Sequence, residues 1–299
     1  MKQTMWTIAV AAFLLLCACS KTDHSTMSSE TPSNAIAPAV PSAVAAASVV
    51  SAVSGAIAAS DVVTRPPVSV ADANARDSKG NTLLHIAAAK GDKGVSELLI
   101  SKGADVNARN NDGDTPLHVV HGGYNVITHG DVRVARLLIA KGADVNAKNK
   151  HGYTPIFYAP KDIVELLIKN GADIEAKTDQ GLTPLLNATS QIDIAELLIS
   201  KGANVNASDN SGYTPLHCGM RGITELLIAH GANVNAKNIN GYTPLHEAVS
   251  DGDDYLVKFL IANGADVNAV DQSGRTLLSY ALWKRRTAIA EVIRQHGGK

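Results

Sequence analysis

Short runs of apolar residues recur along most of the chain in a constant sequence setting. In residues 95–102 the apolar positions Val95, Leu98 and Leu99 are spaced i, i+3 and i+4, which is typical of one face of a helix. A glycine, often preceded by Lys or His, follows every run, and a left-handed C-terminal residue is favoured there. The pattern predicts a series of short helices that end at Gly103, Gly142, Gly171, Gly202, Gly231, Gly264 and Gly297.

A second short helix is expected before each of these, beginning at a threonine. A threonine oxygen caps a helix N-terminus well, and the proline that follows in five of seven cases suits the first helical turn. The spacings between successive threonines are 33, 39, 29, 31, 29 and 33 residues. A period of 20 to 50 residues is typical of stacked repeats. The threonines that open copies one to seven are Thr82, Thr115, Thr154, Thr183, Thr214, Thr243 and Thr276.

Between the glycine and the next threonine, small apolar and polar residues alternate, as in Ala-Asp-Val-Asn-Ala, and a turn ends in a second glycine. This is a hairpin pattern. Helices of about eight residues are marginal alone. Each copy must therefore bury its leucines against the next copy, so stability is a sum over neighbours.

These copies resemble ankyrin repeats, through TPLH at 115–118, 214–217 and 243–246, the Leu-Leu pair, and GADVNA or GANVNA. The resemblance implies an all-α ankyrin-repeat solenoid of about seven helix-turn-helix units with β-hairpin loops over residues 71–299. The distance from the opening threonine to the glycine that ends the second helix differs between copies. It is 21 residues in copies one, six and seven, 19 in copy four and 17 in copies three and five. In copy two it is 27 residues, because that copy contains the segment 121–131. The first helix or its turn must be cut short in copies three to five.

The first residues follow a different pattern. Lys2 precedes an apolar run from Trp6 to Leu16, which is typical of a secretory signal peptide and too short to span a bilayer. Leu16-Cys17-Ala18-Cys19 resembles a bacterial lipobox, which implies acylation of Cys19 and cleavage before it. Ser20 then favours the outer membrane of a Gram-negative cell. We therefore expect a lipoprotein signal peptide at 1–18, with simple secretion as the alternative.

Residues 19–70 contain the Cys19 to be lipidated and then a chain rich in Ala, Ser and Pro, with no charge from Thr31 to Ser60. We expect a flexible linker. An Ala-rich helix or a membrane span over 42–60 remains an alternative, although Ala and Ser rather than Leu, Ile and Phe dominate that stretch.

The net charge and the absence of catalytic motifs limit the classes of function that the chain could have. With 27 Lys and Arg against 28 Asp and Glu, the net charge of −1 gives no general attraction for nucleic acid, so a nucleic-acid partner is not expected. His246-Glu247 fails as a zinc-protease motif because residue 250 is serine. No phosphate-binding loop, GxSxG motif or EF-hand loop occurs. We expect no metal site, no cofactor and no enzymatic activity. The ankyrin resemblance implies a structural role for His85, His118, His217 and His246.

The residue before each TPL motif is the candidate contact position, because the resemblance implies that it projects toward a partner. Four successive copies have Tyr153, Leu182, Tyr213 and Tyr242 there. Tyrosine gives a large contact area at low ordering cost. The alternative is that these side chains pack on their neighbours. Trp283, beside three cationic residues, extends this candidate surface or caps the stack. Recurrent basic residues before the hairpin turn, such as Arg76 and Arg109, predict a basic rim.

The expected function is a non-enzymatic module that binds a protein partner on its concave hairpin and helix face. It is expected to be a monomer that touches the outer membrane only through its lipid and faces the periplasm. An inhibitor or immunity protein is one form of this hypothesis. A passive envelope scaffold and a hydrolase with a site assembled from separated repeats are the alternatives.

Overall fold

The computed structural model describes residues 73–121 and 132–299. Within them the chain divides into two compact units, with the boundary between Asp179 and Gln180. All regular elements of the described residues are helices, accompanied by two isolated β-bridges, Arg76 with Thr82 and Val270 with Thr276. The expected all-α repeat fold is confirmed, and its hairpins are loops rather than paired strands.

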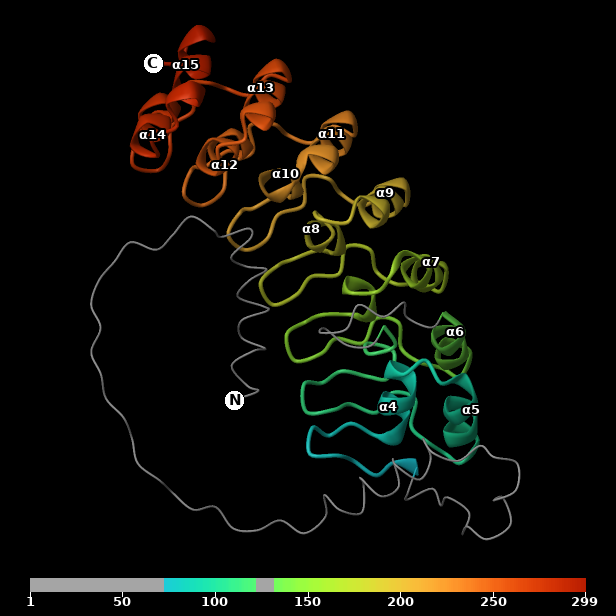
Figure 1. Ribbon diagram of the computed structural model, residues 1–299. Helices are drawn as coiled ribbons and strands as arrows, with labels where there is room; N and C mark the ends of the chain where they lie inside the picture. The colour runs from blue at the N-terminus through green and yellow to red at the C-terminus, as the bar shows by residue number, and fades with distance from the viewer. Residues whose placement is uncertain (1–72, 122–131) are drawn as a thin grey trace, which may run out of the picture. The chain divides into compact units, whose positions relative to one another are not determined.

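In the first unit, helices of successive copies lie side by side (Figure 1). Helix α5 packs on α4 of its own copy and on α6 of the next, and α6 packs on α7. A 3₁₀ helix, η1, packs on α7. The elements are α4 (Leu83–Ala89), α5 (Lys93–Ser101), α6 (Val132–Ala140), η1 (Pro155–Phe157) and α7 (Lys161–Lys169).

The second unit repeats one helical pair four times (Figure 1). Each first helix packs on the second helix of its own copy and on the first helix of the next copy. Second helices of neighbouring copies also pack on each other, as α9 does on α11 and α13 on α15. The elements are α8 (Pro184–Asn187), α9 (Ile192–Ser200), α10 (Pro215–Cys218), α11 (Arg221–Ala229), α12 (Pro244–Asp251), α13 (Asp254–Ala262), α14 (Leu277–Trp283) and α15 (Thr287–Gln295).

The first helix of a copy begins after its threonine, as predicted, but its length varies. Helix α12 has eight residues, whereas α8 and α10 have four. In copy three only a 3₁₀ turn forms, because Pro160 follows closely and disfavours helical backbone in the residue before it. In copy two the TPLH segment forms turns through residue 121, so the α-helix expected there is absent from the described residues.

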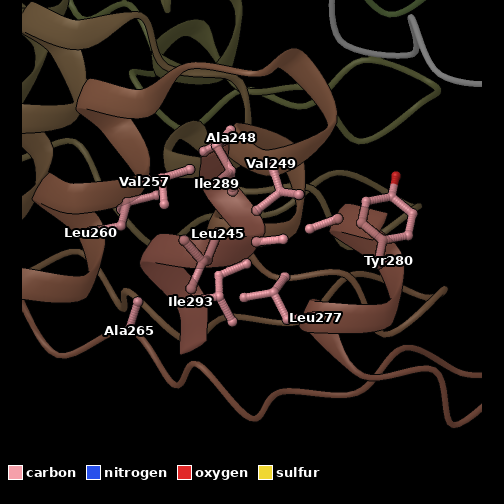
Figure 2. Close-up of a cluster of buried hydrophobic side chains, with 12 residues drawn as sticks. Leu245, Ala248, Val249, Val257, Leu260, Ala265, Leu277, Tyr280, Ile289 and Ile293 are labelled. Carbon is pink, nitrogen blue, oxygen red and sulfur yellow. The ribbon is translucent and has the colours of Figure 1, made fainter. Parts of the chain in front are cut away.

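The core consists of leucines buried between neighbouring copies. The second leucine of the pair is buried throughout, as at Leu99, Leu138, Leu167, Leu198 and Leu227. Leu98, expected on the same buried face, is instead 49% exposed. Burial of one such side chain contributes about 1.5–3 kcal/mol. Figure 2 shows how the last two copies share a single cluster, with side chains from α12, α13, α14 and α15 packed together.

Two ladders of hydrogen bonds join the hairpin side of successive copies. In one, a hairpin amide donates to a carbonyl of the preceding hairpin, as from Gln272 N to Asn240 O at 2.8 Å. In the other, an asparagine bridges two copies: Asn235 donates to Gly264 O at 3.0 Å and accepts from Asp266 N at 2.8 Å. Copy three has Glu175 at this position, and a carboxylate has no N–H to donate. The hairpins are therefore fixed by hydrogen bonds, while the helices are fixed by apolar contacts.

None of the helices among residues 73–121 and 132–299 is both long enough and apolar enough to cross a membrane.

Candidate functional site

The three candidate tyrosines are each positioned by the first residue of their hairpin turn. The Oδ1 atom of Asp209 accepts hydrogen bonds from Ser211 N at 2.8 Å and Tyr213 N at 2.9 Å. Asn238 holds Tyr242 N at 3.0 Å in the same way. These side-chain acceptors are typical of Asx turns. The turn thus fixes the backbone from which each tyrosine projects.

The tyrosine rings are half-buried, and each lies against the side chain four residues later in its copy. The Tyr213 and His217 rings are 5.5 Å apart between centroids, and Tyr242 stacks on His246 at 5.4 Å. In the first unit, Tyr153 meets Phe157 edge-on at 5.2 Å. Each ring therefore packs on its own copy, which the sequence left as an alternative, and still presents part of its surface.

Burial and nearby carboxylates hold the hydroxyls of Tyr213 and Tyr242 in the neutral form. Desolvation, followed by the charge of Glu247, raises the pKa of Tyr213 far above its ordinary value. The same hydroxyl is hydrogen-bonded to the Glu247 carboxylate. Desolvation also raises the pKa of Tyr242. Both groups remain neutral phenols at physiological pH and can donate hydrogen bonds.

Trp283 is the most exposed of the predicted contact residues, at 56%. Its ring lies 5.8 Å from Tyr280, and the Tyr280 ring lies 5.5 Å from Tyr242. Two cations stack on the indole, Arg275 at 4.9 Å and Lys284 at 5.0 Å from its centroid. Tyr242 and Trp283 are thereby linked through Tyr280. We call Tyr213, Tyr242 and Trp283 the aromatic surface.

The other predicted residues lie elsewhere. Leu182 is only 9% exposed, whereas an exposed side chain was expected, so the aromatic surface does not include it. Tyr153 belongs to the first unit. Cys19 lies outside the described residues.

Among the exposed apolar residues that the sequence did not point to, Ile239 is the most exposed. It is 63% exposed on the hairpin that carries Tyr242. The corresponding hairpin positions in the other copies are polar, for example Ser78, Lys150 and Gln272. An apolar residue at a position that is otherwise polar was the available signal.

The recurrent histidines have the structural role that the sequence predicted. His85 Nδ1 accepts from the backbone N–H of Thr82 at 3.1 Å, so its proton resides on Nε2, which lies 2.9 Å from the carbonyl of Asp114 in the next copy. His118 and His217 make the same link to Tyr153 and Tyr242. The imidazole therefore caps its own helix and connects two copies.

Burial disfavours the charged form of these imidazoles. Desolvation lowers the pKa of His217 to about 4 and that of His246 to about 4. In copy six the His246 Nε2 atom is buried with no hydrogen-bond partner among the described residues. No group of three His, Cys, Asp or Glu side chains in that part of the chain has the arrangement of a metal site.

The basic side chains of the predicted rim also make hydrogen bonds within the fold. Arg76 Nη1 donates to the carbonyl of Gly80 at 2.8 Å and to that of Arg109 in the next copy. Arg109 repeats this with Gly113 and Lys148, and Lys148 Nζ donates to Lys177 O at 3.0 Å. These cations hold neighbouring hairpins together, which accounts for their recurrence without a charged partner.

Comparison with known families agrees with this geometry. The family model of ankyrin repeats, described as three copies, matches residues 57–128, 124–178, 160–238 and 218–299. The chain belongs to the ankyrin-repeat family. No curated protein matches it. Ankyrin repeats are protein–protein interaction modules, and the hairpin and first-helix surface described above carries partly exposed aromatic side chains in this ankyrin protein.

Proposed function

We propose that this ankyrin protein is a non-enzymatic module of the cell envelope that binds a protein partner through its aromatic surface. The observation that carries the proposal is the aromatic surface itself. Its rings are fixed by turns and by stacking, yet remain partly exposed. Rigid aromatic residues bind at low entropic cost and dominate the binding energy of many interfaces.

The envelope location rests on the sequence, because Cys19 follows a lipobox-like segment. Acyl chains on Cys19 would hold the repeats at the outer membrane, facing the periplasm. A tethered surface can occlude the active site of an envelope enzyme or toxin without any chemistry. This is the inhibitor or immunity form of the proposal.

The partner proposal predicts a selective effect of tyrosine substitution. Tyr213→Ala combined with Tyr242→Ala should weaken partner capture by at least about 30-fold, equivalent to about 2 kcal/mol, because each ring is lost from the interface. Capture is measured with the purified variant as bait, and circular dichroism confirms that the helices remain.

The matched control is Tyr255→Ala. Tyr255 is an exposed tyrosine on α13 whose hydroxyl donates to Glu225, away from the aromatic surface. Capture should be unchanged in that variant. Equal loss in both, or full capture by the double variant, would move the partner site away from the aromatic surface.

The anchoring proposal predicts that Cys19→Ala shifts the protein from the membrane to the soluble fraction, because a chain without acyl groups has no anchor. Cys17→Ala serves as the control, since it keeps a small residue at that lipobox-like position and should leave the protein in the membrane fraction. Membrane retention of Cys19→Ala would contradict the lipid anchor.

A further inference from the structure

A cavity of about 370 Å³ opens in the second unit, between the first helices of copies five and six. It arises from the unequal lengths of α10 and α12. These helices pack on each other, but α10 has four residues and α12 has eight. The last turn of α12 therefore extends past the end of α10, and Ala248 and Asp251 line the space that remains. The volume lies at the small end of the range of ligand pockets, about 300–1,000 Å³.

The cavity has apolar walls and a charged rim. Leu216, Leu256 and Leu260 form part of the wall. The charged residues that line it are Glu247, Asp251, Asp253 and Arg221. Arg221 is already paired with Asp253 at 2.8 Å, and Asp253 also caps α13. The pair is neutral as a whole, so the remaining charge of the lining is that of two carboxylates.

Asp251 is the carboxylate best placed to receive a ligand, because it lies exposed at the end of α12. Desolvation raises its pKa, although the positive charges of Arg286 and Lys284 act in the opposite direction. A cation beside this carboxylate would offset the cost of its partial burial. An anionic ligand would meet two like charges in the lining, and a purely apolar one would bring no opposite charge to them.

We propose that the cavity receives a lysine or arginine side chain of the protein partner. The alkyl stem would lie against the leucine wall, as such stems commonly do on apolar surfaces, and the terminal cation would meet Asp251 and Glu247. This inference rests on the proposed function and names one feature of the partner. The cavity adjoins the aromatic surface, because Glu247 is hydrogen-bonded to the Tyr213 hydroxyl.

The test uses four blocked tripeptides, Gly-X-Gly, in which X is lysine, arginine, norleucine or glutamate. Binding to the full chain in detergent is followed by NMR of the methyl groups of Met220 and Leu256, both in the cavity lining. We expect the lysine or arginine peptide to bind at least about 10-fold more tightly than norleucine, which has an apolar chain without the charge, and glutamate not to bind. Norleucine binding as tightly as lysine and arginine would overturn the proposal.

Two substitutions of Asp251 test whether this carboxylate binds the cation of the basic peptide. Asp251→Asn should weaken binding of the basic peptide about 10-fold, and Asp251→Lys should abolish it by placing a resident cation at the rim. Asp254→Asn is the matched control, because Asp254 is exposed on the neighbouring helix but does not line the cavity. Unchanged binding in both Asp251 variants would contradict the assignment. Cadaverine binding more tightly than the lysine peptide would assign the cavity to a free amine instead.

Failure of this inference can be told apart from failure of the proposed function. If no basic peptide binds while Tyr213→Ala still impairs partner capture, the cavity proposal alone is wrong. If the basic peptide binds through Asp251 while the tyrosine variants capture the partner normally, the cavity proposal stands and the aromatic surface does not.

Discussion

At the scale of single residues, the buried histidines make the fold sensitive to acid. Each imidazole accepts a backbone N–H at Nδ1, so a proton on that atom would oppose the capping bond. The folded-state pKa of His217 and of His246, about 4, lies below the ordinary value of 6.5. The unfolded chain therefore binds more protons between these values. The stabilising contribution is complete above pH 6.5 and is lost as the pH falls toward 4.

We therefore predict that the free energy of unfolding of the second unit falls between pH 7.5 and pH 4.5, by at most about 3 kcal/mol per histidine. Urea unfolding followed by the fluorescence of Trp283, which lies in the last copy, measures it. His217→Gln should flatten this dependence, because an amide does not titrate. His230→Gln, at an exposed position, should leave it intact. An unchanged slope in His217→Gln would contradict the role of burial.

Predictions about single residues succeeded where the role of a residue depends on its neighbours in the sequence. The start of each first helix follows from its threonine and the residues beside it, and the structure shows it, whereas the structural role of the histidines was implied by the resemblance to ankyrin repeats. The burial of Leu182 and the engagement of Arg76 depend on atoms of other residues in space, such as the carbonyl of Arg109 in the next copy. A single copy of the motif contains no information on those contacts.

At the scale of elements, the hairpins approach one another so closely that glycine is required where they touch. Gly241 has a φ of +76°, and a Cβ atom there would lie 2.7 Å from Gln272 N, the donor of the ladder bond to Asn240. Gly264 has a φ of +88° but nothing within 4 Å of such an atom. Substituting Gly264 therefore tests backbone strain alone, whereas substituting Gly241 tests backbone strain together with the contact between hairpins.

Gly264→Ala should cost about 1–2 kcal/mol, because alanine is strained in the left-handed region. Gly241→Ala should cost at least about 2 kcal/mol more, since the added methyl group also breaks the ladder between copies six and seven. Thermal and urea unfolding followed by circular dichroism measure the difference. Equal destabilisation by the two substitutions would show that the hairpins are not in contact.

Helix starts were predictable, and so was the shortening of the first helix in copies three to five, but the exact length of each helix was not. The threonine fixes the start, but the end depends on how the chain reaches the second helix. In copies one and six, Asp92 and Asp253 cap that helix with side-chain acceptors. In copies three and five, Pro160 and Met220 occupy the cap position and make no such bond. The sequence indicated that copies three to five are short, yet the cavity beside α10 follows only from the packed helices.

At the scale of the whole molecule, the residues that stabilise the fold are different from the residues that are available to bind a partner. Within each unit the leucines and the ladders hold each copy to the next, whereas the residues at the hairpin positions of Ile239 and Tyr242 differ between copies. A net charge of −1 gives the chain no general field for a polyanion. We therefore expect the aromatic surface to bind a protein.

In-cell photocrosslinking tests that claim most directly. A photoreactive phenylalanine analogue replaces either Ile239, exposed on the hairpin of copy six, or Lys258, exposed on α13. We predict one discrete protein adduct from position 239, lost when Tyr213→Ala is added, and none from position 258. An adduct from position 258 alone, or no adduct from position 239, would contradict the account.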